Sequence, residues 1–114
     1  MSLTSFSKRR AEMVEEWRSW TSRVAKAAED VLADAEVYVF GSVVRGDYTG
    51  GSDVDILVVS NRVPEGLGGR AKIRSKIEDK AKLPTSHPFE IHIATPEEAK
   101  IYLRKAGQDI LRLR

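Results

Sequence analysis

The chain has 114 residues, of which 41% are hydrophobic and 32% are charged, and its formal net charge is +2. A chain of this size and composition predicts one globular domain, residues 1–114, and so small a net charge does not by itself indicate a nucleic-acid partner. The absence of cysteine excludes disulfides, thiolate metal sites and cysteine nucleophiles.

The N-terminal segment is polar and then basic, and it lacks the apolar core of a secretory signal. No apolar run in the chain approaches the roughly 20 residues that span a bilayer. We therefore expect a cytoplasmic protein without a membrane partner. Basic side chains near the two ends are expected to be solvated, and these are Lys8, Arg9, Arg10, Arg112 and Arg114.

The first predicted element is one long amphipathic helix over residues 5–33. Its apolar side chains recur at alternating steps of four and three and form one stripe, at Met13, Trp17, Trp20, Val24, Ala27 and Val31. The two tryptophans could form a base-stacking platform, but at this spacing we expect them in the core.

Two strands follow, joined by a glycine-rich connection. Residues 35–40 are β-branched and aromatic and predict a short strand that ends at Gly41 and Ser42. Residues 43–52 contain three glycines and are expected to form turns. The nearly continuous apolar run in residues 53–60 predicts a buried central strand, although it opens with two aspartates.

The remaining elements alternate between helix and strand. Residues 61–69 predict a loop, and residues 70–83 predict a helix with an apolar stripe at Ile73 and Ile77. Residues 89–94 alternate between apolar and polar side chains and predict a third strand.

A capping box at Thr95 and a proline at the first helical position predict a last helix, which runs to about Ala106 and ends at Gly107. The order helix, strand, strand, helix, strand, helix predicts a small α/β or α+β domain. We expect its helices to pack on a sheet of three or more strands.

Three acids form the candidate reactive centre. Asp53 and Asp55 stand two residues apart on a predicted strand, so both carboxylates lie on one face. Their repulsion would be relieved by a divalent cation, and Mg²⁺ prefers such oxygen ligands. Glu90 would supply a third carboxylate if its strand pairs beside theirs. Three carboxylates around two cations are the layout used for in-line phosphoryl and nucleotidyl transfer, in which one ion activates the attacking hydroxyl and the other stabilises charge on the leaving pyrophosphate.

The turn after the first strand offers groups for phosphate binding. Gly41 lets the backbone approach a ligand, and Ser42 adds a hydroxyl. Arg45 could pair with a phosphate through its forked guanidinium. Each of these features is common alone, and the order Gly-Ser, Asp-x-Asp and later Glu is what favours a joint site.

Other polar residues have simpler interpretations. His92 shares a strand face with Glu90 and could line the site, but a polar neighbour on a solvated strand face is the favoured interpretation. His87 lies in a proline-flanked loop and is expected to be structural or exposed. Asp47 could assist near the phosphates or cap a turn.

Two further groups of side chains stay without a role. Lys72, Lys76 and Lys80 form one basic helical face, which could meet an acidic partner or RNA but is more often solvated. Tyr48 and Tyr102 could stack a base, but no spacing supports this.

Residues 41–58, GSVVRGDYTGGSDVDILV, resemble the signature of the polymerase-β-like nucleotidyltransferases, in which Asp-x-Asp follows Gly-Ser after ten residues. Arg45, Gly46 and Ser52 also match the minimal (MNT) type, and Glu90 matches the family's third carboxylate. The resemblance implies a mixed sheet flanked by helices and a nucleoside triphosphate, such as ATP, as donor. It implies that two Mg²⁺ ions are held by Asp53, Asp55 and Glu90, and that the phosphates lie near Gly41, Ser42, Arg45 and Ser52.

The minimal nucleotidyltransferases are commonly paired with a small helical HEPN protein, an RNase toxin. In the characterised type the nucleotidyltransferase transfers AMP to a tyrosine hydroxyl of that toxin. The resemblance therefore implies an antitoxin enzyme that moves a nucleoside monophosphate from a triphosphate to a partner's hydroxyl. Two alternatives stay open: a module that neutralises its partner by binding alone, and a subunit that senses nucleotide without turnover.

Overall fold

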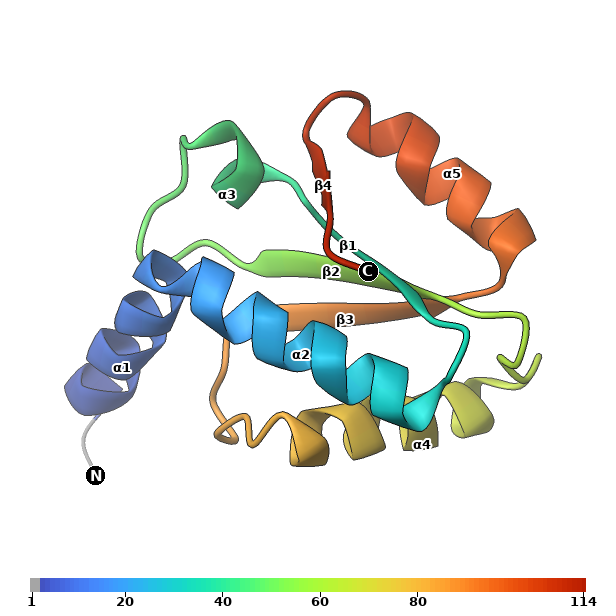
Figure 1. The fold of residues 1–114 in the computed structure, drawn as a ribbon. Coiled ribbons are helices and arrows are strands. Elements are labelled where there is room, and N and C mark those ends of the chain that lie inside the picture. Colours follow the sequence, from blue (N-terminus) through green and yellow to red (C-terminus); the bar gives the residue numbers. More distant parts are fainter. Residues whose placement is uncertain (1–2) are drawn as a thin grey trace.

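The computed structural model describes the backbone of residues 3–114 and the side chains from Ser7 onward. The elements in chain order are α1 (Leu3–Glu15), α2 (Trp17–Val31), β1 (Glu36–Phe40), α3 (Ser42–Arg45), β2 (Val54–Val59), α4 (Leu67–Lys80), β3 (Phe89–Ala94), α5 (Pro96–Ala106) and β4 (Ile110–Arg112). They form an α+β fold with helices on both faces of one sheet (Figure 1), as the sequence predicts. No helix within residues 3–114 is long and apolar enough to cross a membrane.

The sheet has four strands in the order β3-β2-β1-β4. β2 and β3 are parallel, whereas β1 is antiparallel to both β2 and β4. The parallel register pairs Val54 with Phe89 and Asp55 with Glu90. The mixed sheet implied by the resemblance is thus present. The pairing of its central strands, β1 and β2, brings the Gly-Ser turn after β1 close to the aspartates at the start of β2.

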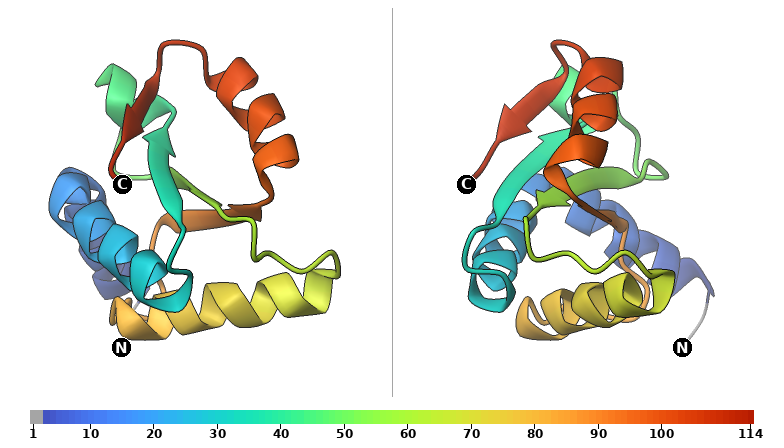
Figure 2. Two further views of the ribbon diagram at one scale, coloured as in Figure 1. Left: turned by 45° about the vertical axis from the view of Figure 1, so that its right-hand side comes forward. Right: turned by 90° about the vertical axis from the view of Figure 1, so that its right-hand side faces the viewer.

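The two faces of the sheet differ in how they are covered (Figure 2). Helices α1, α2 and α4 bury one face, against strand side chains that include Val37, Val39, Val54, Ile56, Val58, Phe89, Ile91 and Ile93. Helix α5 packs on the other face, over Leu57, Val59 and Ala94. Because strand side chains alternate between faces, the polar positions 55, 90 and 92 share the α5 side.

The predicted helix over residues 5–33 is two helices, so the prediction of one continuous helix is wrong. The chain bends at Glu16, whose φ of −95° and ψ of 26° leave the helical range. The Glu16 N–H still donates to the Glu12 carbonyl at 3.0 Å, so the bend interrupts the helix without a loop. The apolar stripe is nevertheless confirmed: Trp17 is buried, and Trp20 packs against the core beside Phe89, with ring centroids 6.2 Å apart.

Other boundaries show where local sequence was sufficient. Strand β3 has the predicted bounds, and the capping box of α5 forms, with Thr95 and Glu98 each accepting from the other's N–H. Helix α4 begins three residues before the predicted start, at Leu67. Helical turn α3 and strand β4 were not predicted. A three-residue strand has no pattern of its own, and β4 exists because its backbone pairs with β1.

Candidate active site

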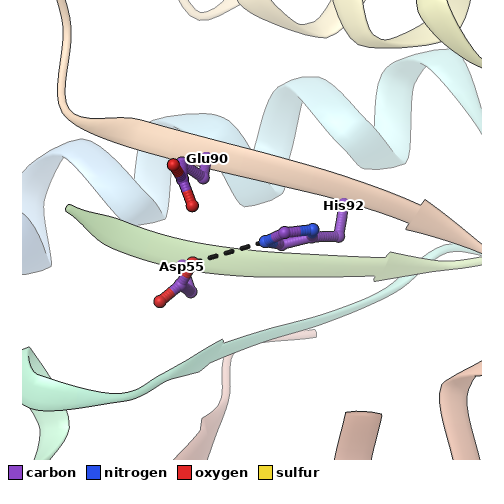
Figure 3. A group of neighbouring side chains, drawn as sticks. All are labelled: Asp55, Glu90 and His92. Carbon is purple, nitrogen blue, oxygen red and sulfur yellow. Dashed lines mark hydrogen bonds and ion pairs between the residues drawn. The ribbon is translucent and has the colours of Figure 1, made fainter. Parts of the chain in front are cut away.

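The sheet brings two of the predicted acids together with a histidine (Figure 3). Asp55 and Glu90 are direct partners in the β2–β3 register, and His92 follows on the same face. One ligand atom from each of the three lies within 4.8 Å of the others. The His92 Nε2 atom stands 3.3 Å from Asp55 Oδ1. The His92 ring thus contacts a candidate reactive carboxylate, which favours the alternative that His92 lines the site over that of a polar neighbour on a solvated face.

The two carboxylates of this cluster are electrostatically unequal. The hydrogen bond with His92 lowers the pKa of Asp55, and its contact with Glu90 lowers it further, against the opposing effect of burial. For Glu90, the hydrogen bond with Asp55, burial, and the negative charges of Asp53 and Asp55 all raise the pKa. Ionisation of both carboxylates at once is therefore unfavourable in this cluster. A bound cation or a proton retained on one carboxylate would relieve it.

Asp53, the third predicted acid, lies just before β2, and its side chain contacts helix α1. Its side chain is 51% exposed and forms an ion pair with Arg10 of α1. Arg10 also donates to the Ser52 carbonyl at 3.2 Å. The expectation that Arg10 is merely solvated is wrong, because only 24% of its side chain is exposed. Asp53 is not part of the group formed by Asp55, Glu90 and His92, although its charge acts on Glu90.

Gly41 lies directly against the cluster. Its φ of +94° is a conformation that residues with a side chain rarely adopt, and a Cβ placed there would lie 3.3 Å from Asp55 Oδ2. Ser42 then begins the single helical turn α3, in which the Val44 and Arg45 N–H groups donate to the Gly41 carbonyl at 3.1 and 3.2 Å. The Gly-Ser turn and the Asp-x-Asp strand, which are ten residues apart in sequence, therefore meet in space.

The two remaining residues predicted to contact phosphate are engaged locally. Arg45 pairs with Asp47 at 3.2 Å and with Asp109 at 3.4 Å, and these hydrogen bonds raise its pKa. The Ser52 hydroxyl accepts the Thr49 N–H at 2.9 Å and so stabilises the turn before Asp53. Asp47, left open between two roles, is thus a partner of Arg45.

A pocket of about 250 Å³ adjoins the cluster, lined by Phe40, Gly41, Arg45, Asp55, Lys105, Ala106 and Asp109. It joins the end of β1 to the last turn of α5. Beside it, the His92 ring lies 5.9 Å from the ring of Phe40 and 5.4 Å from that of Tyr102. Sequence reasoning did not single out Lys105 or Asp109, because nothing local indicates that the end of α5 returns to the Gly41 turn.

The other polar residues follow the simpler interpretations. The His87 Nε2 donates to Glu78 at 2.6 Å, and its Nδ1 accepts the Phe89 N–H at 3.0 Å, so this histidine is structural as expected. Tyr48 contacts Glu15 at 3.3 Å. Three lysines on one face of α4 are exposed, and these are Lys72, Lys76 and Lys80.

Comparison with known proteins decides the family. The family model of the nucleotidyltransferase domain matches residues 21–110, which include the Gly-Ser turn and all three acids. The chain belongs to the nucleotidyltransferase domain family. The nucleotidyltransferase assignment suggested by residues 41–58 is confirmed at this level, and so is the prediction of an enzyme of this class.

Solved structures agree with this membership. One crystal structure, of a protein assigned as a nucleotidyltransferase, is 35% identical in sequence to this chain and has a TM-score of 0.63. The match covers 80% of this chain and 94% of the other. A second, from Sulfolobus solfataricus, is 20% identical with a TM-score of 0.58, covers 96% of this chain and 83% of its own, and shares the fold. No curated protein matches the chain significantly.

Proposed function

We propose that this nucleotidyltransferase transfers a nucleoside monophosphate from a nucleoside triphosphate to a hydroxyl, with Mg²⁺ held by Asp53, Asp55 and Glu90. The observation that carries the proposal is the pairing of Asp55 with Glu90 on neighbouring parallel strands, with Gly41 against the Asp55 carboxylate. Carboxylates from distant segments converge there beside the Gly-Ser turn. That combination suits a phosphate-bearing substrate that arrives with cations.

The donor set fits Mg²⁺ on its chemistry. Asp55 and Glu90 offer hard carboxylate oxygens within 4.8 Å, and Asp53 adds negative charge nearby. The hydrogen bond with Asp55, burial, and the negative charges of Asp53 and Asp55 raise the pKa of Glu90, and a bound dication would favour its ionised form. When bound, two such ions would supply charge stabilisation for the departing pyrophosphate and for the attacking oxygen.

The chain's own groups have separable roles in this proposal. The backbone of Gly41 and Ser42 holds the phosphates, because no side chain at position 41 blocks their approach to Asp55. His92 is a positioning residue that orients Asp55 through its Nε2 hydrogen bond. Glu90, the direct partner of Asp55 in the β2–β3 register, is also placed to help accept the proton of the acceptor hydroxyl.

For the acceptor, the proposal follows the resemblance of residues 41–58 to the minimal nucleotidyltransferases. We propose ATP as donor, AMP as the transferred group and a hydroxyl on a HEPN-type protein as acceptor, which makes the chain an antitoxin. We also take residues 1–114 as one domain, which the family match to residues 21–110 supports.

The test is transfer of label from [α-³²P]ATP in the presence of Mg²⁺, with the chain alone and with the product of the adjacent gene. Asp55→Asn keeps the shape of the side chain but removes its charge. We expect it to lower transfer by at least about a hundredfold, the usual effect of losing a metal-ligating or charge-stabilising group. Asp53→Asn should also abolish detectable transfer.

Asp30→Asn is the matched control, because Asp30 is an exposed aspartate on α2 away from the cluster. It should transfer label like the unaltered chain. Circular dichroism should show the same fold for all variants. Full transfer by Asp55→Asn would refute the assignment. Neutralisation of the partner by Asp55→Asn without any transfer would favour the binding-only alternative.

A further inference from the structure

The pocket beside the acids has a cation that no motif indicates. One wall is the end of β1 with Asp55, and the opposite wall is the last turn of α5, with Lys105 and Ala106. The backbone ties these walls together, because the Gly41 N–H donates to the Asp109 carbonyl at 3.1 Å. The end of α5 therefore has a fixed place next to the Gly-Ser turn.

The charges that line this pocket are differently engaged. Arg45, the arginine of the Gly-Ser signature, is paired with Asp47 and Asp109. Among the residues whose side chains the structure describes, no carboxylate forms an ion pair with Lys105. Lys105 is thus the pocket cation that can take up a new anion without first breaking an existing pair.

A triphosphate carries several negative charges, and two of the pocket's lining residues, Asp55 and Asp109, are themselves acidic. An ammonium group on the opposite wall would offset that repulsion, and lysine binds phosphate well as a point charge. A lysine near the C-terminus of a helix also has a simpler explanation, since it complements the helix dipole. Arg104 lies in the same last turn of α5, so it complements the helix dipole as well as Lys105 does. Only Lys105 of the two lines the pocket, and the dipole does not explain that difference.

We infer that Lys105 binds the β- and γ-phosphates of the donor triphosphate in the pocket between α5 and the Gly41 turn. This inference rests on the proposed function. It assigns to α5 the phosphate contact that the signature would place on Arg45. It also sets the direction of the donor: the pyrophosphate lies toward α5, and the nucleoside lies away from it.

Calorimetric titration with α,β-methylene-ATP and with AMP, each with Mg²⁺, tests the inference. Lys105→Met should weaken binding of the triphosphate analogue by about tenfold or more, the value of a charge-assisted hydrogen bond. Its affinity for AMP should stay within about twofold, because AMP lacks the β- and γ-phosphates. Lys105→Arg should keep most of the triphosphate affinity, and the matched control Arg104→Met should keep all of it.

The outcomes separate this inference from the proposed function. If the unaltered chain binds the analogue and Lys105→Met binds it equally well, the role of Lys105 is wrong while the proposed function stands. Equal losses for AMP and for the analogue would also overturn it, because the contact would then lie at the α-phosphate or the nucleoside. If the unaltered chain neither binds the analogue nor transfers label, both fall together.

Discussion

At the residue scale, Gly41 carries two requirements that no other residue type meets. Its φ of +94° excludes most side chains, and the space that a Cβ would occupy lies 3.3 Å from an oxygen of Asp55. Glycine at position 41 is therefore needed to leave room for the Asp55 carboxylate, besides the role in phosphate binding that the proposed function gives it.

We predict that Gly41→Ala costs stability and activity together. The backbone strain should lower the free energy of unfolding by about 1–3 kcal/mol. Displacement of the Asp55 carboxylate should lower label transfer by about tenfold or more, since small misplacements of reacting groups are costly. Chemical denaturation and the transfer assay measure the two effects.

Gly46→Ala is the matched control for this variant. Gly46 also has a positive φ, +89°, but a Cβ there would meet nothing within 4 Å. It should lose a similar amount of stability, about 1–2 kcal/mol, and keep most of its transfer activity. Equal losses of activity in both variants would mean that strain alone matters and the Asp55 contact does not.

Single residues also mark how far the sequence can predict this site. The period-two spacing predicted Asp55 on a strand face, and the alternation of β3 predicted Glu90 likewise. Their meeting also needed the two strands to be neighbours in the register that pairs them. His92 was on the same face by the same alternation, but its contact with Asp55 depends on strand register, which no local pattern specifies. The position of Lys105 at the pocket depends on how α5 packs beside the Gly41 turn, and no local sequence pattern predicts that packing.

At the scale of elements, helix α1 contacts the loop that leads into the reactive strand. Arg10 holds Asp53 and the Ser52 carbonyl, and a Cβ on Gly50 would lie only 2.9 Å from the Cβ of Ala11. Sequence periodicity predicted the apolar stripe of the N-terminal helices correctly. It could not show the bend at Glu16, which has neither glycine nor proline to mark it, nor the contact with the loop that the bend allows.

We predict that Arg10→Met lowers the Mg²⁺ concentration needed for half-maximal label transfer. The guanidinium competes with a cation for Asp53, and a partly exposed ion pair worth about 0.2–1 kcal/mol corresponds to a change of about 1.4-fold to fivefold. A Mg²⁺ titration of the transfer rate measures it. Arg9→Met, at an exposed neighbouring position, should leave the titration unchanged. A higher Mg²⁺ requirement in Arg10→Met would show that the arginine assembles the site instead of competing for it.

At the scale of the whole molecule, most of the core lies on one side of the sheet. Helices α1, α2 and α4 bury that face, and the reactive groups occupy the other, beside α5. Contacts at the far ends of the strands can therefore affect stability without affecting the reaction. Asp34 is one of these: it accepts from the Ser60 hydroxyl at 2.5 Å and from the Asn61 N–H at 2.9 Å, and so joins the start of β1 to the end of β2.

We predict that Asp34 contributes to stability in a pH-dependent way. The hydrogen bonds from Ser60 and Asn61 lower its pKa below the ordinary 3.8. The stabilisation is therefore complete above 3.8 and is lost as the pH falls through the lower, folded-state pKa. Asp34→Asn should be less stable than the unaltered chain at neutral pH by about 0.5–1 kcal/mol, a small value because the carboxylate is exposed to solvent.

Urea denaturation at a series of pH values, from neutral to well below 3.8, measures this difference. The gap between Asp34→Asn and the unaltered chain should close at the acid end. Asp30→Asn should show no comparable gap at any pH. A gap that persists unchanged in acid would mean that the carboxylate charge is not what stabilises this junction.

The backbone hydrogen bond from Gly41 to Asp109 fixes the end of α5 beside the Gly-Ser turn, and this affects how a sequence change could alter the site. Asp55 and Glu90 stand on two neighbouring parallel strands, β2 and β3, whose spacing is fixed by the sheet. Lys105 stands instead on a helix whose end is set by the short connection through Gly107. A change in the length of that connection would move the lysine relative to the strands and leave the carboxylates untouched. In the proposed function, the carboxylates of the sheet and the lysine that binds the donor's phosphates thus stand on separate elements, and each can be altered without rebuilding the other.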